Sequence, residues 1–99
     1  MRVKYSTQSI EDRNELFDFI TYQCDSPITA FRYLQGIKDA INKIAKNPEA
    51  YPIRYNPSLS QYGPFVRRVN YKKMAIIYTA NDKFVYIHRI IPESMITGL

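Results

Sequence analysis

Three runs rich in β-branched and aromatic residues fill the second half of the chain and limit what it can fold into. The runs are Phe65–Tyr71, Met74–Thr79 and Phe84–Ile91, and short polar breaks separate them. Lys72-Lys73 is short enough for a tight turn, and Ala80–Lys83 contains Asn and Asp, which tolerate turn conformations and bond to the local backbone. This pattern predicts an antiparallel meander of three strands.

A short strand and two helices are expected before the meander. Met1–Ser6 alternates apolar and basic side chains, as a strand does, and Ser6 suits the cap of a following helix. An amphipathic pattern over Ser9–Cys24 predicts that helix. Its apolar stripe consists of Ile10, Leu16, Phe17, Ile20 and Cys24, and we expect Cys24 to be a small packed residue.

The second helix has the most regular apolar periodicity in the chain. Ser26 and Pro27 suit its cap and first turn, where the missing N–H of proline costs nothing, and Asn47-Pro48 stops it. Its apolar positions step by four, three, four and three residues, which predicts a seam that packs on the first helix and the sheet. These positions are Ala30, Leu34, Ile37, Ile41 and Ile44.

The order of elements predicts an α+β fold of two layers, β-α-α-β-β-β. The helical hairpin should cover one face of a small, mainly antiparallel sheet and leave the other face open. A chain of 99 residues suffices for one domain, residues 1–99, and is too short for a second. Glu49–Pro64 shows no periodicity and is expected to be a loop, and Glu93–Leu99 is expected to be too short to add a packed element.

The excess positive charge lies in the second half of the chain. Residues 1–50 contain seven Lys or Arg and seven Asp or Glu, whereas residues 51–99 contain seven Lys or Arg and two Asp or Glu, which together give the net charge of +5. Such asymmetry indicates either a surface for nucleic acid or for an acidic protein, or else a solvated basic surface that keeps the protein soluble.

The single cysteine excludes an internal disulfide, so a reducing compartment is expected. No apolar run approaches the length of a membrane span, and the N-terminus lacks the apolar core of a secretory signal. We therefore expect a cytosolic protein with no membrane contact.

Catalytic chemistry has few candidate residues. Cleavage of RNA at its 2′-hydroxyl needs a base, an acid and cations around the phosphate. His88 is the only histidine, and strict alternation places Phe84, Tyr86, His88 and Ile90 on one side of the last strand and Val85, Ile87, Arg89 and Ile91 on the other. His88 and Tyr86 should then reach the open face, where Glu93 is the one carboxylate near enough to pair with His88; the alternative is a structural histidine.

Metal and cofactor chemistry is not expected. One His and one Cys cannot make a zinc site, the second half of the chain has no acidic cluster, and there is no Gly-rich phosphate loop. Arg67, Arg68, Lys72 and Lys73 could instead bind phosphates beside Tyr71 and Tyr78, or meet the acidic side chains of a protein partner. Alternation puts Arg67 and Arg68 on opposite faces of the sheet, and we expect the inner one to pair with the acidic first helix.

Several local strings, in this order and spacing, resemble the RelE/ParE superfamily of bacterial toxins, the toxin halves of type II toxin–antitoxin modules. They are Ser26-Pro27, Asn47–Pro52, Phe65–Val69 with Tyr78 eleven residues after Arg67, and Ile87–Ile91 with its internal Arg89. The long helical hairpin and the string at the exit of the second helix look more like the ParE branch, whose members poison DNA gyrase, than the RelE branch, whose members cut mRNA in the ribosomal A site.

Two departures from the RelE pattern bear on the choice between the branches. Ala75 stands where RelE-like nucleases usually carry an arginine, three residues before Tyr78. Pro92, Glu93 and Ser94 stand where these nucleases carry basic residues or histidine after the last strand.

The resemblance implies a growth-inhibiting toxin of a plasmid-stabilisation or stress module that poisons gyrase and is neutralised by a cognate acidic antitoxin, which folds on the basic sheet. It leaves two alternatives. One is a metal-independent, ribosome-dependent endoribonuclease of mRNA with His88, Arg67 and Lys73 as catalytic residues, and the other is an inactive binding domain. In either toxin, the residues expected to bind the partner are Arg67, Arg68, Lys72, Lys73, Tyr86 and Arg89.

Overall fold

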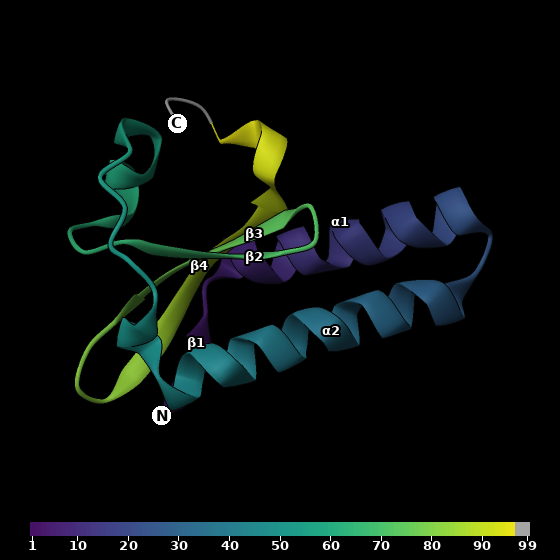
Figure 1. Ribbon diagram of the computed structural model, residues 1–99. Coiled ribbons are helices and arrows are strands. Elements are labelled where there is room, and N and C mark those ends of the chain that lie inside the picture. Colours follow the sequence, from purple (N-terminus) through teal and green to yellow (C-terminus); the bar gives the residue numbers. More distant parts are fainter. Residues whose placement is uncertain (97–99) are drawn as a thin grey trace.

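The computed structural model describes residues 1–96, which form a four-stranded sheet with a helical hairpin on one face (Figure 1). The sheet order is β1-β4-β3-β2; β1 runs parallel to β4, and the other pairs are antiparallel. This arrangement confirms the predicted α+β fold. The elements are β1 (Arg2–Tyr5), α1 (Thr7–Cys24), α2 (Pro27–Lys46), the 3₁₀ turns η1 (Pro48–Ala50) and η2 (Pro57–Tyr62), β2 (Arg67–Tyr71), β3 (Met74–Ala80), β4 (Phe84–Pro92) and the 3₁₀ turn η3 (Glu93–Met95).

Both helices begin at the serine caps that the sequence predicts. The Ser6 hydroxyl oxygen accepts a hydrogen bond from the Ser9 N–H at 2.9 Å, and the Ser26 hydroxyl oxygen accepts one from the Thr29 N–H at 3.3 Å. The Ser6 hydroxyl also donates to the His88 carbonyl oxygen at 2.7 Å. The start of α1 is therefore bonded directly to β4.

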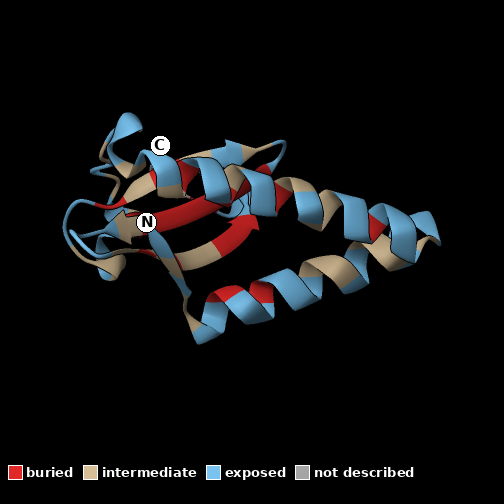
Figure 2. Cartoon of the chain, turned by 90° about the horizontal axis from the view of Figure 1, so that it is seen from below, coloured by how far each residue is buried: buried red, intermediate tan, exposed pale blue. Residues whose placement is uncertain are grey.

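The main hydrophobic core lies between the helical hairpin and the sheet. Ile37, Ile41 and Ile44 of α2 are buried in it, as the periodicity predicts. The outward side and far end of the hairpin are mostly exposed (Figure 2). In α1 the expected stripe is only partly buried, because Ile10 and Cys24 are exposed, and the expectation that Cys24 is packed is wrong. The sheet side of the core consists of Met74, Ile76, Tyr78, Val85, Ile87 and Ile90.

The second face of the sheet is not open, contrary to the prediction. Leu59 of η2 and Ile96, just after η3, pack against Ala75 and Ile77 of β3 in a second buried cluster. The segment expected to be a featureless loop thus contains two 3₁₀ turns, each begun by a proline, and the C-terminal segment does add a packed element. Single apolar anchors such as Leu59 produce no periodicity, so a pattern search does not find them; residues 97–99 lie outside the described residues.

A β-bulge in β4 changes which side chains share a face. Ile77 pairs with Arg89 but the next residue, Tyr78, pairs with Ile87, so His88 is the extra residue. Ile87 and Ile90 are therefore both in the main core although they are three residues apart, whereas Ile91 is in the second cluster. The strict alternation predicted for this strand ends at His88.

Gly36 of α2 is a point of close approach between the helix and the sheet. A Cβ atom at this position would lie 2.0 Å from the Tyr71 hydroxyl oxygen and 2.3 Å from the carbon that carries it. The Tyr71 ring also packs edge-to-face on Tyr33, with centroids 5.2 Å apart, so it is held from two sides. Only glycine leaves room for this ring.

We predict that Gly36→Ala destabilises the protein although alanine is the better helix former. Overpacking lowers the free energy of unfolding by roughly 1–3 kcal/mol, and the higher helix propensity of alanine offsets about 1 kcal/mol of this loss. The free energy of unfolding in urea should therefore fall by up to roughly 2 kcal/mol. Asn42→Ala, at an exposed position of the same helix, is the control and should leave stability unchanged or slightly raised; a stabilising Gly36→Ala would contradict the close packing.

Candidate functional site

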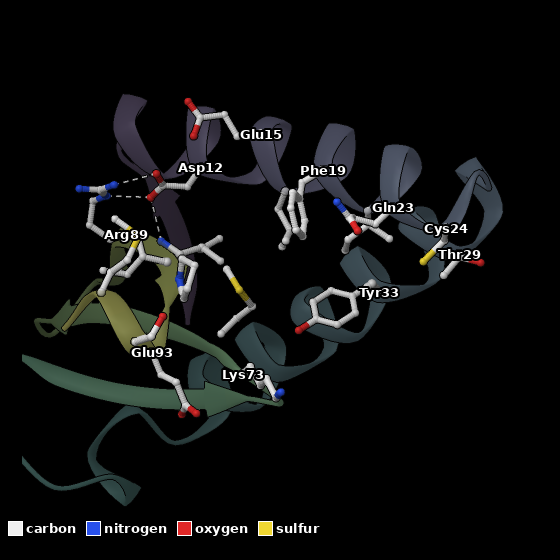
Figure 3. Close-up of a pocket in the computed structure, with 18 residues that line it drawn as sticks. Asp12, Glu15, Phe19, Gln23, Cys24, Thr29, Tyr33, Lys73, Arg89 and Glu93 are labelled. Atoms are coloured by element: carbon white, nitrogen blue, oxygen red, sulfur yellow. Dashed lines mark hydrogen bonds and ion pairs between the residues drawn. The ribbon is translucent and has the colours of Figure 1, made fainter.

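A groove of about 870 Å³ lies beneath the far halves of the two helices (Figure 3). The hairpin runs past the edge of the sheet in Figure 1, so the sheet-facing side chains of its far half have no strand beneath them. Phe19 of α1 and Met95 of η3 are both largely exposed there. The apolar lining of the groove consists of Leu16, Phe19, Ile20, Tyr33, Met74, Ile90, Ile91, Pro92 and Met95.

A buried ion pair forms one wall of the groove and fixes α1 on β4. The Arg89 guanidinium donates to both Asp12 carboxylate oxygens, from Nε at 2.8 Å and from Nη2 at 2.9 Å, and the Ile90 N–H donates to the same carboxylate at 3.0 Å. The Asp12 side chain is 5% exposed and that of Arg89 is 24% exposed. Because the Asp12 carboxylate stabilises its charge, the pKa of Arg89 is raised above its ordinary range.

Lysines of the β2–β3 turn lie at the opposite rim. Lys73 lines the groove. Lys72 has a φ of 53°, and its ammonium group lies 5.3 Å from the centre of the Tyr33 ring and 5.5 Å from that of Tyr71. The rim therefore carries charges of both signs beside an apolar floor, because the carboxylates of Glu15 and Glu93 line the groove together with Lys73.

His88 lies on the face of the sheet away from the helices, in an aromatic cluster. Its ring is 4.7 Å from that of Tyr86 and 5.4 Å from that of Tyr62, and its Nε2 shares a hydrogen bond of 2.8 Å with the Thr79 hydroxyl. Burial lowers the pKa of His88 below its ordinary value. Tyr86 is half-buried here, and the helical core is on the other side of the sheet.

The three residues named for nuclease chemistry are not brought together. The Glu93 N–H donates to the Lys73 carbonyl oxygen, so Lys73 lies at the level of Glu93, five residues and roughly 16 Å along the chain from His88. Arg67 pairs with Tyr78, a residue of the helix-side core, and its guanidinium donates to the carbonyl oxygens of Glu49 and Tyr51.

The expected partner of His88 is also bonded elsewhere. The Glu93 carboxylate accepts a hydrogen bond from the Asn70 amide at 3.2 Å and lies 4.0 Å from an Arg68 guanidinium nitrogen. Glu93 is therefore not the partner of His88, since the two residues are separated along β4 and η3.

The basic residues expected to bind a partner do not form one surface. Arg68 is buried and donates to the Asn70 side-chain oxygen at 2.9 Å, whereas Lys73 and Arg89 line the groove. Neither Arg67 nor Arg68 pairs with the first helix, which corrects that expectation. The reason is the strand order: α1 packs on β4, and β2 is the edge strand on the far side of β3, so Arg89 makes the pair instead.

The apolar lining of the groove was missed by the sequence reasoning. Phe19 lies outside the apolar stripe predicted for α1, and so does its exposed neighbour Tyr22. Large apolar residues off the core-facing stripe of an amphipathic helix are the signal that could have indicated the groove.

Within residues 1–96, no group of three or more His, Cys, Asp or Glu side chains could hold a metal ion, and no helix is long and apolar enough to cross a membrane.

Comparison with known protein families identifies a toxin family. The family described as "ParE toxin of type II toxin-antitoxin system, parDE" matches residues 3–97. A chain in the solved structure "Chromosomal ParDE TA system from P. aeruginosa" has a TM-score of 0.73 and 18% identity, covering 93% of this chain and 95% of that one. No curated protein sequence gives a match. The structural likeness, at this identity, shows the shared fold.

We predict that Asp12→Asn destabilises the protein strongly. The variant keeps the size of the side chain but leaves the Arg89 guanidinium without its counter-charge in a mostly buried place. Breaking a buried pair costs about 3–5 kcal/mol, and because Arg89 is partly exposed we expect roughly 2–3 kcal/mol in urea unfolding. Glu15→Gln makes the same chemical change at an exposed position of α1 and should alter stability by less than about 0.5 kcal/mol; equal effects would contradict the role of the pair.

His88 should make the folded state less stable in mild acid. Because its pKa is lowered on folding, the unfolded chain binds a proton that the folded chain does not. The free energy of unfolding is therefore not reduced by His88 above its ordinary pKa of 6.5. It decreases as the pH falls from there toward the lowered pKa. Urea unfolding across this range, in the native chain and in His88→Asn, measures the effect: the variant should lose part of the pH dependence, and identical curves would show that burial of His88 has no such consequence.

Proposed function

The chain belongs to the family of ParE toxins of type II toxin–antitoxin systems, and on that basis we propose that it inhibits bacterial growth by poisoning DNA gyrase in the cytoplasm. We further propose that a cognate antitoxin neutralises it by occupying the groove beneath the helical hairpin. The observation that carries the proposal is the family match over nearly the whole chain, together with a groove that its own side chains leave unfilled.

The chemistry of the groove suits a segment of an antitoxin that orders on binding. Apolar side chains of an amphipathic segment would cover Phe19, Tyr33 and Met95, whose surfaces lie on the groove. An acidic residue of the same segment would meet Lys73 at the rim, and a basic residue would meet Glu15 or Glu93, which also line the groove. The buried Asp12–Arg89 pair would serve as a rigid wall, because its charges already satisfy each other.

The arrangement of the sheet supports a target-binding toxin more than a nuclease. A nuclease of this chain would draw on His88, Lys73 and Arg67, and these residues lie on different faces or at different ends of the sheet. No described carboxylate is hydrogen-bonded to His88, whose ring nitrogen is bonded to Thr79. A toxin that inhibits growth by binding a protein target does not require these three side chains to lie close together.

The proposal is tested with the purified chain, gyrase and plasmid DNA. We expect the protein to inhibit supercoiling and to accumulate gyrase-linked DNA breaks, and its induction in a bacterial host to raise the DNA-damage response within minutes while mRNA stays intact. Codon-linked cuts in mRNA with undamaged DNA would overturn the gyrase assignment and favour the ribosome-dependent alternative.

The groove is tested separately by placing a charge on its apolar floor. Phe19→Glu should keep growth inhibition but weaken antitoxin binding by at least about tenfold, the effect expected at a buried interface anchor. Tyr22→Glu, one helical turn further along α1 and outside the groove lining, is the matched control and should bind the antitoxin normally. Equal antitoxin affinities for the two variants would show that the antitoxin binds elsewhere.

A further inference from the structure

The face of the sheet that points away from the helices is only partly covered. Leu59 of η2 and Ile96 pack over Ala75 and Ile77 of β3. The sheet order places β4 and then β1 beyond β3, and the described members of this buried cluster include none from β1 or from the first half of β4. The outer side of these two strands is therefore not covered by a hydrophobic cluster.

Aromatic side chains occupy consecutive outward positions of β4. Val85 and Ile87 are buried in the helix-side core. Alternation along the strand therefore turns Phe84, Tyr86 and His88 to the outer face, where the Tyr86 and His88 ring centroids are 4.7 Å apart. Alternate residues of a strand are roughly 7 Å apart, so the three rings form a regular row. All three side chains are half-buried, and each keeps part of its surface exposed.

His88 is held in this row as an uncharged ring. Its Nε2 shares a hydrogen bond of 2.8 Å with the Thr79 hydroxyl, and its ring lies 5.4 Å from that of Tyr62. Burial lowers the pKa of His88, so the ring carries no charge at neutral pH. His88 therefore adds an aromatic surface to the row.

Basic side chains flank the aromatic row. Arg2 of β1 pairs with Phe84 in the parallel register of the two strands. Lys4 pairs with Tyr86, and its ammonium group lies 4.3 Å from the centre of the Phe84 ring. Lys83 directly precedes the row, in the turn between β3 and β4, and all three basic residues are exposed. The rings thus lie beside three cations.

The strands themselves contain no carboxylate that could neutralise these cations. None of the residues of β1, β2, β3 and β4 is Asp or Glu. The ion pairs formed within residues 1–96 involve Arg68 and Arg89 instead. The turn that carries Lys83 has one carboxylate, that of Asp82, so the surface keeps an excess of positive charge and favours an acidic partner.

Single-stranded nucleic acid fits this combination better than an acidic protein does. Aromatic side chains stack on the bases of a single strand, whereas cations beside them contact the phosphates. β4 is a central strand of a four-stranded sheet, the position from which sheets present such rings to single strands. An acidic protein segment would pair with the cations but would not require a row of rings between them.

We propose that the outer side of β1 and β4 is a binding surface for single-stranded nucleic acid. Phe84 and Tyr86 stack on successive bases, and the basic residues beside them contact the phosphates. This inference goes beyond the proposed function, because a toxin that binds gyrase needs no such surface. It is also distinct from nuclease chemistry, because binding requires neither a general base nor a general acid. Stacking and phosphate contacts are common to DNA and RNA, so both are expected to bind.

The test measures binding of the purified chain to fluorescein-labelled oligonucleotides by fluorescence anisotropy. The probes are oligo-dT, oligo-U and a DNA duplex, each of about 20 nucleotides per strand, at salt concentrations from about 50 to 200 mM. Polyglutamate serves as a competitor that represents an acidic protein. The unfolding temperature of every variant is recorded alongside.

The aromatic row is tested by replacing its rings with aliphatic side chains. Phe84→Leu/Tyr86→Leu should weaken binding of oligo-dT and oligo-U by at least about tenfold, because two stacking surfaces are lost. Phe84→Tyr/Tyr86→Phe keeps both rings and should bind within about twofold of the native chain. Tyr22→Leu/Phe31→Leu removes two rings, 84% and 64% exposed, from the tip of the hairpin and should bind normally.

The cations are tested at constant net charge. With three phosphate contacts, the affinity for a single strand should fall with salt at a logarithmic slope of about −2, and Lys4→Gln/Lys83→Gln should reduce this slope by about 1.4. Lys38→Gln/Lys46→Gln removes the same charge from exposed positions of α2 and should leave the slope unchanged.

Four results would overturn the inference. They are native affinity in the Phe84→Leu/Tyr86→Leu variant, equal effects of the two lysine pairs, binding of the duplex as tightly as of the single strands, and displacement of the oligonucleotide by polyglutamate at an equal concentration of charge. The last of these would identify the surface as one for an acidic protein. Binding of oligo-dT alone or of oligo-U alone supports the surface and identifies its natural strand.

Discussion

The structure depends on the Asp12 carboxylate, which holds α1 on β4 through the Arg89 guanidinium and the Ile90 N–H. The predicted apolar stripe of α1 is only partly buried, so this helix relies on polar contacts for its position more than α2 does. Ser6 adds a second such contact, to the His88 carbonyl oxygen. Both contacts are at the near end of the hairpin, and its far end is therefore left to overhang the sheet and form the groove.

The β-bulge at His88 allows one strand to serve both sides of the sheet. Before it, Val85 and Ile87 fill the helix-side core; after it, Ile90 continues that core while Ile91 joins the cluster on the other face. Arg89 follows the bulge directly and reaches Asp12 in the helical layer, and the pKa of Arg89 is raised further by Tyr62 of η2. The same irregularity holds His88 between Tyr62 and Tyr86, away from Lys73 and Arg67, so this sheet does not bring these three residues together.

Within the described residues, the groove beneath the helical hairpin is left unfilled by the chain's own side chains. The groove is apolar with a charged rim, and an amphipathic segment can fill it without disturbing the fold. Tyr55 and Phe65 are exposed elsewhere on the molecule, and the positive φ of Phe65 belongs to the turn at residues 64–65.

Local signals in the sequence determined the elements of this protein, because caps, prolines and apolar periodicity act within a few residues. Ser6, Ser26 and Pro27 begin the helices where expected, and the seam from Ala30 to Ile44 packs as its spacing predicts. The strings that resemble the RelE/ParE superfamily likewise led to the family that the comparisons show. The tertiary structure alone decided which arginine meets the acidic helix, that Leu59 and Ile96 cover the second face, and that the groove exists. Each of these depends on strand order, on one bulge or on the overhang of a helix past the sheet, and such long-range geometry leaves no periodic trace in the sequence.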